Sequence, residues 1–156
     1  MPRRRRPREV FISHSARNRS FVELLARTLR RHRIRYWYSV RHIAGAKQWH
    51  DEIGRALKRC DWFIVVLSPQ AVRSKWVKRE LLYALQRDDF QERIIPLVYR
   101  SCNKDELSWT LSSLENVDFR GNLAKGFRDL FRIWGTTFDG VTGRASAAAR
   151  RGAARR

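Results

Sequence analysis

Cysteine is scarce in this chain of 156 residues, which contains only Cys60 and Cys102. They form no CxxC motif and have no Cys/His spacing, so we expect reduced, inert thiols and a cytoplasmic location. The histidines also lack metal-site spacing with cysteines or carboxylates, so no metal is expected. There are four of them: His14, His32, His42 and His50.

Long hydrophobic runs are missing as well. No apolar stretch approaches the roughly 20 residues that a membrane-spanning helix needs. The basic start, MPRRRRPREV, is not followed by an apolar segment, which argues against a secretory signal. The motifs GxGxxG, GxxxxGK[ST] and GxSxG are absent too. A dehydrogenase that uses NAD as a redox cofactor is therefore not expected.

Acidic residues are few: 15 Asp and Glu face 34 Lys and Arg, which gives a net charge of +19. Residues 1–8 contribute +5 and residues 136–156 contribute +4. Both ends are poor in apolar residues, so we expect disordered basic arms at 1–8 and 136–156 around one domain at 9–135. The arms either contact nucleic acid or an acidic surface weakly by counterion release, or only keep the chain soluble.

Strand patterns alternate with helix patterns between the arms. Expected strands cover residues 9–13, 34–38, 62–67, 93–99 and 114–119, and expected helices cover 18–32, 49–58, 72–86 and 121–134. A loop is expected at 39–48, and Pro96 indicates a bulge or an edge position for its strand. The alternation predicts a single-domain, flavodoxin-like α/β sandwich with a mostly parallel five-stranded sheet in the order 2-1-3-4-5.

The most informative segment is CDWFIVVLSPQAVRSKWVKRELLYAL, residues 60–85. Its apolar run, Trp62–Leu67, is typical of a strand buried on both faces of a parallel sheet. The basic segment that follows carries one acid, Glu80, among lysines and arginines. Ligands of open α/β sheets bind at the carboxyl ends of strands, and Glu80 is expected near such an end. On its own, however, this glutamate also fits a solvated helix residue in a surface ion pair.

Five motifs occur in order along the chain. They are VFISHS (10–15), YWYSVRHIAGAKQW (36–49), WHDEI (49–53), DWFIVVLSP (61–69) and WVKREL (76–81). In these motifs and their intervals the chain resembles a bacterial Toll/interleukin-1 receptor (TIR) domain, from Glu9 to Trp134. Two positions depart from the family pattern: Ser39 stands where many relatives have an acid, and Gly45 precedes Ala46, where the loop glycine usually lies.

The resemblance implies an enzyme of the type that cleaves NAD+ at the bond between nicotinamide and ribose. Its catalytic residue would be Glu80, partly exposed in a cleft. One carboxylate is enough for this reaction, because the cationic nicotinamide leaves neutral without a proton. NAD+ is then the substrate and no cofactor is needed. The product is ADP-ribose or a cyclic form of it, and a role in bacterial defence or stress signalling is expected.

The resemblance also implies two sets of contact residues. The expected substrate-binding residues are Ser13, His14, Ser15, Trp37, Tyr38, Trp49 and Trp76. The expected interaction loop, for self-association through TIR–TIR contacts, contains Ser39, Arg41, Ile43 and Gly45. Arg17, Arg41 and Lys47 are candidates to meet the pyrophosphate, or are plain surface charges. Two alternatives to the enzyme stay open: a non-catalytic TIR–TIR interaction module, and a basic protein associated with nucleic acid.

Overall fold

The computed structural model describes residues 6–38 and 46–140, without the side chains of residues 46–49. Its strands are β1 (Glu9–Ser13), β2 (Arg35–Tyr38), β3 (Trp62–Leu67), β4 (Ile94–Val98) and β5 (Val117–Asp118). Its α-helices are α1 (Arg19–Arg31), α2 (Ala46–Arg59), α3 (Pro69–Val72), α4 (Lys75–Gln86) and α5 (Leu123–Ile133). Four short 3-10 helices complete the order: η1 (Ala16–Asn18), η2 (Asp88–Phe90), η3 (Lys104–Glu106) and η4 (Trp109–Ser113).

The strands form one five-stranded sheet in the order β2-β1-β3-β4-β5, and all four pairings are parallel. This confirms the predicted fold class and strand order. β3 lies at the centre, and all six of its residues are buried. Helices on both faces of the sheet exclude water from it, which is why β3 is apolar throughout.

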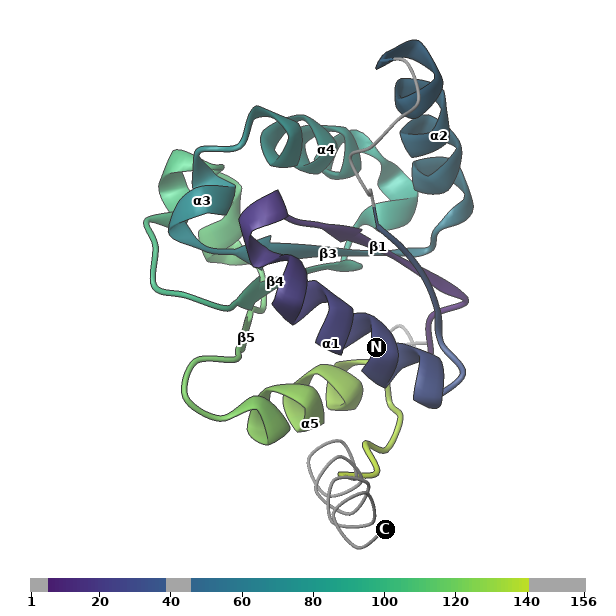
Figure 1. The fold of residues 1–156 in the computed structure, drawn as a ribbon, viewed down its shortest axis with the longest axis vertical. Coiled ribbons are helices and arrows are strands. Elements are labelled where there is room, and N and C mark those ends of the chain that lie inside the picture. The colour runs from purple at the N-terminus through teal and green to yellow at the C-terminus, as the bar shows by residue number, and fades with distance from the viewer. Residues whose placement is uncertain (1–5, 39–45, 141–156) are drawn as a thin grey trace, which may run out of the picture.

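Two hydrophobic clusters fill the space on either side of the sheet. Val10 and Ile12 of β1 point into the cluster that contains the buried faces of α1 and α5. Phe11 points into the other cluster, with the buried faces of α2 and α4. In Figure 1, α2 and α4 lie on one side of the sheet and α1 and α5 on the other. The period of two along β1 therefore assigns each side chain to one layer.

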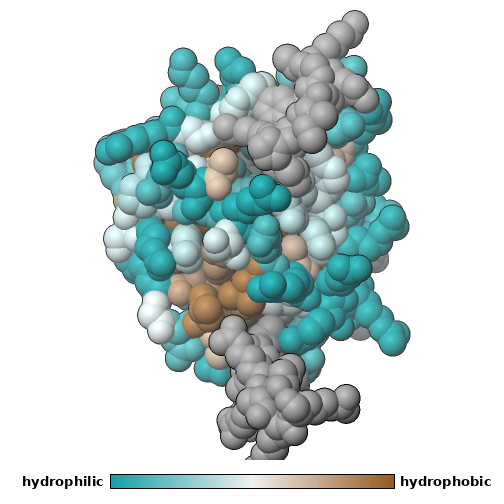
Figure 2. All heavy atoms as spheres, in the orientation of Figure 1, coloured by the Kyte–Doolittle hydropathy of each residue, from teal (hydrophilic) through white to brown (hydrophobic). Residues whose placement is uncertain are grey.

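The surface is mainly hydrophilic on the face that Figure 2 shows, with one hydrophobic area in its lower half, where α1 and α5 meet. Leu123, at the start of α5, is one of the exposed large apolar residues. Within the described ranges, no helix combines the length and the apolar character that crossing a bilayer requires.

Pro96 corrects the prediction of a bulge or an edge strand. The register of β3 with β4 continues without a break from Phe63↔Ile94 to Leu67↔Val98, so there is no bulge. β4 is also not an edge strand, because β5 pairs with it. That pairing begins only at Leu97, however, so the missing N–H of Pro96 interrupts no pairing with β5.

Several element boundaries differ from those expected. The fifth strand is only two residues long, and α2 begins at Ala46, inside the loop expected at 39–48. The helix expected at 72–86 is two helices, α3 and α4. Ser74 separates them, because its side chain accepts a hydrogen bond from the N–H of Val77 and caps α4.

The folded unit also extends beyond the expected limits of 9 and 135. Arg6 donates to the carbonyl of His32, and the N–H of Arg8 donates to Asp61 at 3.0 Å. At the other end, Phe138 lies against Phe131, with ring centroids 5.6 Å apart. Residues 6–8 and 136–140 are therefore attached to the domain. Disorder was expected of the whole arms, 1–8 and 136–156, and for residues 1–5 and 141–156 that prediction lies outside the described ranges.

Candidate active site

The carboxyl ends of β1 and β3 carry small polar side chains. Ser13 ends β1 and is 1% exposed, and Ser68 follows β3 directly and is fully buried. The Ser68 hydroxyl accepts from the N–H of Ala71 at 3.0 Å and so caps α3. It also donates to Oδ1 of the buried Asn18 at 2.6 Å, which joins the two loops. These two hydrogen bonds hold the Ser68 hydroxyl in place at the polar end of the sheet.

Glu80 reaches this end of the sheet from α4. The buried residues of the helix are Val77, Glu80, Leu81 and Ala84, which share one face. The hydroxyl of Ser13 donates to Oε1 of Glu80 at 2.9 Å, across 67 residues of sequence. A carboxyl group in a buried position needs such donors, because an unpartnered polar group would lose its hydration without compensation.

The structure corrects the expected exposure of Glu80. The residue was expected to be partly exposed in a cleft, but it is only 8% exposed. The cause is its place in the inward stripe of α4, between the apolar Val77 and Leu81. The carboxyl group is thus held close to the end of β1 rather than presented to solvent.

The other expected substrate contacts divide between the two faces of the sheet. Trp37 packs with the cluster that includes Val77 and Leu81, so it lies on the same face as Glu80. Its ring centroid is 5.1 Å from that of Phe11. Tyr38 packs against the opposite cluster, and the ring of His14 meets it edge-on at 5.6 Å. The structure therefore brings together Ser13, Trp37 and Glu80 on one face, apart from the His14–Tyr38 pair.

Three further candidates have distinct positions. Ser15 caps the 3-10 helix η1, accepting from the N–H of Arg17 at 3.3 Å, which is a structural role. The half-buried Trp76 lies one turn before Glu80, and the guanidinium of Arg79 stands 5.2 Å from the centre of its ring. Trp49 lies in α2, but its side chain is outside the described part of the chain.

The expected interaction loop is not part of the described structure either. Ser39, Arg41, Ile43 and Gly45 lie outside the described residues, as does the side chain of Lys47.

The surroundings of Glu80 are strongly cationic. α4 contributes Lys75, Lys78 and Arg79 in its first two turns, all of them exposed. Arg17 and Arg73, also exposed, follow the carboxyl ends of β1 and β3. Together these cations create a positive electrostatic potential, which favours the approach of a dianionic pyrophosphate. No single one of them is positioned as a specific phosphate ligand.

Neither cysteine is a candidate nucleophile. Burial raises the pKa of the Cys60 thiol to about 12, so hardly any thiolate exists near neutral pH. Cys60 also lies just before β3, at the opposite end of the strand from Ser68. Burial raises the pKa of Cys102 as well. Among the described residues, no group of three His, Cys, Asp or Glu side chains is placed to hold a metal ion.

The Asn18–Ser68 pair is not among the site residues expected from the sequence. Ser68 belongs to the motif DWFIVVLSP, and a serine directly before a proline at the first helical position is typical of a helix cap. Asn18 had no comparable signal, because its role depends on the approach of a loop 50 residues away. The pair joins the loops that follow β1 and β3, and so fixes the polar end of the sheet.

The chain belongs to the TIR domain family, because the model of that family matches residues 10–131. It is 31% identical over 105 residues to the NAD(+) hydrolase PdTIR of Paracoccus denitrificans (strain Pd 1222), covering 65% of this chain and 34% of the relative. It is 26% identical over 100 residues to the 2' cyclic ADP-D-ribose synthase BtTIR of Bacteroides thetaiotaomicron, covering 64% and 35%. The chain therefore spans about a third of the length of these relatives.

Among solved structures, the chain is similar to the TIR domain of the Toll-related receptor TRR-2 from Hydra magnipapillata. The TM-score is 0.66 at 22% sequence identity, and the match covers 81% of this chain and 98% of that one. At this identity the similarity supports the fold alone. It agrees with the strand order and layers described above.

Proposed function

We propose that this TIR domain cleaves NAD+ at the bond between nicotinamide and ribose. The observation that carries the proposal is the hydrogen bond between Ser13 and Glu80, which fixes a buried carboxyl group at the carboxyl end of β1. This is the end of an open parallel sheet at which ligands bind. The names of the two bacterial relatives, an NAD+ hydrolase and a cyclic ADP-ribose synthase, support the same substrate.

In the proposed mechanism, Glu80 stabilises the positive charge that develops on the ribose as the bond to nicotinamide breaks. A preorganised carboxylate does this well where water is excluded, and the residue is only 8% exposed. Nicotinamide takes the bonding electrons and leaves neutral, so no acid has to protonate it. Water then attacks the ribosyl carbon, giving ADP-ribose and one proton. Attack by a hydroxyl of the same molecule gives a cyclic ADP-ribose instead.

Ser13 is the proposed positioning residue for Glu80. Its hydroxyl donates to Oε1 and so limits rotation of the carboxylate. The proposed aromatic contacts of the substrate are Trp37 and the half-buried Trp76. Trp37 lies on the same face of the sheet as Glu80, and Trp76 precedes Glu80 by one turn of α4. Lys75, Lys78 and Arg79 would supply the positive potential for the pyrophosphate.

The burial of Glu80 favours an enzyme that is activated by assembly. A substrate needs access to a carboxyl group that is nearly enclosed in the isolated chain. We propose that TIR–TIR contacts, with the interaction loop at Ser39, Arg41, Ile43 and Gly45, open or complete the site. The expected role in bacterial defence or stress signalling stays a prediction.

The test is to incubate concentrated protein with NAD+ and to separate the products by chromatography. Glu80→Gln keeps the size of the side chain and removes its charge, so we expect nicotinamide release to fall at least about a hundredfold. Glu23→Gln is the matched control, because Glu23 is exposed and, among the described residues, forms an ion pair with Arg19 of the same helix alone. The control should cleave NAD+ like the wild type.

Two results would contradict the proposal. If Glu80→Gln retains most of the wild-type rate at equal concentration, the assigned mechanism is wrong. If the folded wild-type protein releases no nicotinamide at any concentration, the alternative of a non-catalytic interaction module is favoured. Near-UV circular dichroism of each variant shows whether the fold is intact.

A further inference from the structure

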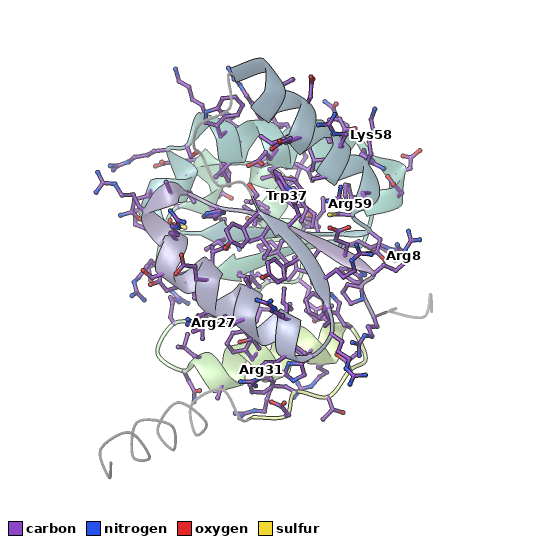
Figure 3. All side chains as sticks on the ribbon, turned by 45° about the vertical axis from the view of Figure 1, so that its right-hand side comes forward. Arg8, Arg27, Arg31, Trp37, Lys58 and Arg59 are labelled. Atoms are coloured by element: carbon purple, nitrogen blue, oxygen red, sulfur yellow. The ribbon has the colours of Figure 1, made fainter. Side chains whose placement is uncertain are left out.

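Arginines gather at the amino end of the sheet, around the turn between α1 and β2. Residues 24–38 contain five of them and no acid. These five residues form the arginine patch: Arg27, Arg30, Arg31, Arg33 and Arg35. All five are exposed. Arg27 and Arg31 lie on the same side of α1, one helical turn apart (Figure 3).

Two acids next to the patch, one in the sequence and one in the sheet, are bound to arginines outside it. Glu23 pairs with Arg19 at 3.1 Å. Glu9 lies opposite Arg35 in the register of β1 with β2, but Arg59 binds its carboxylate twice, at 2.7 and 3.1 Å.

One member of the patch has an acidic partner, since Arg31 donates to Oδ1 of Asp139 at 3.0 Å. In the described part of the chain, the other four patch arginines take part in no ion pair: Arg27, Arg30, Arg33 and Arg35.

Structural needs explain only part of this charge. Cations in the last turn of a helix interact well with its dipole, which accounts for Arg30 and Arg31. Arg33 follows the C-cap with a φ of 58°, a conformation in which glycine is the favoured residue. The chain has an arginine there, and a further one two residues on at the start of β2. Mutual repulsion makes such a cluster costly unless an anion binds it.

The patch is separate from the candidate active site. Glu80 and Ser13 lie at the carboxyl end of β1. The patch lies at the end of α1 and the start of β2, which is the amino end of the parallel sheet (Figure 1). Its arginines therefore do not serve the pyrophosphate of a nucleotide bound beside Glu80. An anion bound by the patch would therefore be a different one.

Residues near both ends of the described chain contact His32, which lies between Arg31 and Arg33 of the patch in the sequence. Arg6 donates to the carbonyl of His32, and the N–H of Asp139 donates to its Nε2 at 3.3 Å. In the sequence, three arginines directly precede Arg6 and five follow Asp139 without any acid. The sequence on either side of these anchoring contacts thus carries the same charge as the patch.

We propose that the arginine patch binds the phosphate backbone of double-stranded nucleic acid, without sequence preference. A guanidinium group can donate two parallel hydrogen bonds to the oxygens of one phosphate. A duplex presents about one negative charge per 1.7 Å of its axis. The exposed large apolar side chains of the described residues are Leu82, Tyr83, Trp109 and Leu123, and none of them lies in residues 19–38, the segment that carries the patch. The patch thus offers neither a platform for stacking unpaired bases nor an apolar anchor for a bilayer. The proposal does not depend on the proposed NAD+ cleavage.

The experiment measures binding of the full-length protein to a short, fluorescein-labelled DNA duplex of mixed sequence by fluorescence anisotropy, between about 50 and 200 mM NaCl. The patch variant combines Arg27→Gln, Arg30→Gln, Arg33→Gln and Arg35→Gln. The control variant removes the same charge elsewhere, with Arg55→Gln, Lys58→Gln, Lys104→Gln and Arg128→Gln. Near-UV circular dichroism and thermal unfolding show whether both are folded.

We expect the patch variant to bind the duplex at least about tenfold more weakly than the wild type. The slope of log K against log salt should become less steep by about 0.9 for each phosphate that the protein no longer neutralises. The control variant should keep both the affinity and the slope within about a twofold change. If the fourfold variant does not fold, Arg27→Gln with Arg30→Gln tests the same point, with about half the change in slope.

Three outcomes would overturn the proposal. The wild type does not bind the duplex, or the control variant loses as much affinity as the patch variant, which would indicate a general effect of net charge. Alternatively, vesicles of anionic lipid bind the wild type through the patch more tightly than the duplex does, which would indicate a membrane partner. Because the patch lies apart from Glu80, none of these results bears on NAD+ cleavage.

Discussion

The hydroxyl of Ser13 donates a 2.9 Å hydrogen bond to Oε1 of Glu80. One residue ends the first strand of the sheet and the other lies on the inward face of α4. Their contact links the two elements that border the candidate active site, and both side chains are nearly inaccessible to solvent. The orientation of the proposed catalytic carboxylate is therefore set by the fold before any substrate binds.

The first prediction concerns this contact. Ser13→Ala removes this donor and weakens the restraint on the orientation of the Glu80 carboxylate, so we expect kcat for nicotinamide release to fall about ten- to a hundredfold. KM should change less, because Ser13 is proposed to position Glu80 rather than to bind the substrate. Loss of the donor should also reduce the free energy of unfolding by about 1–3 kcal/mol, measured by urea denaturation.

Ser112→Ala is the control for that variant. Ser112 is exposed and donates to Asp105 on the surface, so both the rate and the stability should stay close to wild type. A wild-type kcat for Ser13→Ala would show that the hydrogen bond has no part in catalysis. If kcat fell only as much as the fraction of folded protein, the hydrogen bond between Ser13 and Glu80 would contribute to stability alone.

The second prediction concerns assembly. If contacts between domains open the buried site, the rate per molecule should rise with protein concentration, and the oligomeric state should rise with it. Gly45→Pro, in the proposed interaction loop, should reduce both. The measurements are initial rates over a wide range of concentration, with the mass in solution followed by light scattering. A constant rate per molecule that Gly45→Pro leaves unchanged would indicate a self-sufficient monomer.

Much of the fold could be predicted because it depends on local pattern. The unbroken apolar run of β3 and the alternation of strands with helices were enough to predict the parallel sheet and its order. Pro96 shows the limit of this reasoning. Local propensity indicated a bulge or an edge, whereas the outcome depended on where a two-residue partner strand begins to pair. Pairing between distant segments is not visible in a local pattern.

The site could be predicted in its key residue but not in its burial. A motif pointed to Glu80, and the end of the first strand pointed to Ser13. The spacing of Val77, Glu80, Leu81 and Ala84 is that of one helix face, and it was available in the sequence. Glu80 was nevertheless expected to be partly exposed, as a residue in a ligand-binding cleft. Ser13, which donates a hydrogen bond to Glu80, is 67 residues away and is brought close only by the tertiary fold.

The third prediction uses two glycines as a matched pair. A Cβ at Gly126 of α5 would stand 2.6–2.9 Å from ring atoms of Phe119, a residue buried between α5 and the sheet. Gly126→Ala should therefore reduce the free energy of unfolding by about 1–3 kcal/mol through overpacking. A Cβ at Gly54 of α2 meets nothing within 4 Å, so Gly54→Ala should stabilise the protein by about 0.5–1 kcal/mol.

Urea denaturation of both variants checks this pair. The opposite signs matter more than the magnitudes, since both substitutions add the same methyl group to a helix. If Gly126→Ala were as stable as Gly54→Ala, the close packing of α5 on Phe119 would not exist in solution. The T-shaped contact of Phe119 with Phe127, at 5.1 Å, would then also be in doubt.

The fourth prediction places the limits of the folded unit. A chain of residues 6–140 loses eight arginines and no acid, but keeps the contacts of Arg6 and Phe138. A chain of residues 6–135 also loses Phe138, whose ring lies 5.5–5.6 Å from those of Phe127, Phe131 and His32. We expect the longer chain to keep the stability of the full-length protein, and the shorter one to lose about 1–3 kcal/mol by urea denaturation.

Activity and binding should respond differently to the same truncation. The residues proposed for NAD+ cleavage lie between Ser13 and Glu80, so the 6–140 chain should cleave NAD+ at the full-length rate. Its affinity for duplex DNA should fall and its salt dependence should become less steep, because eight arginines are gone, while the patch arginines still bind. Loss of NAD+ cleavage in a 6–140 chain that folds would show that the terminal segments belong to the mechanism. Unchanged DNA binding would show that the patch acts without them.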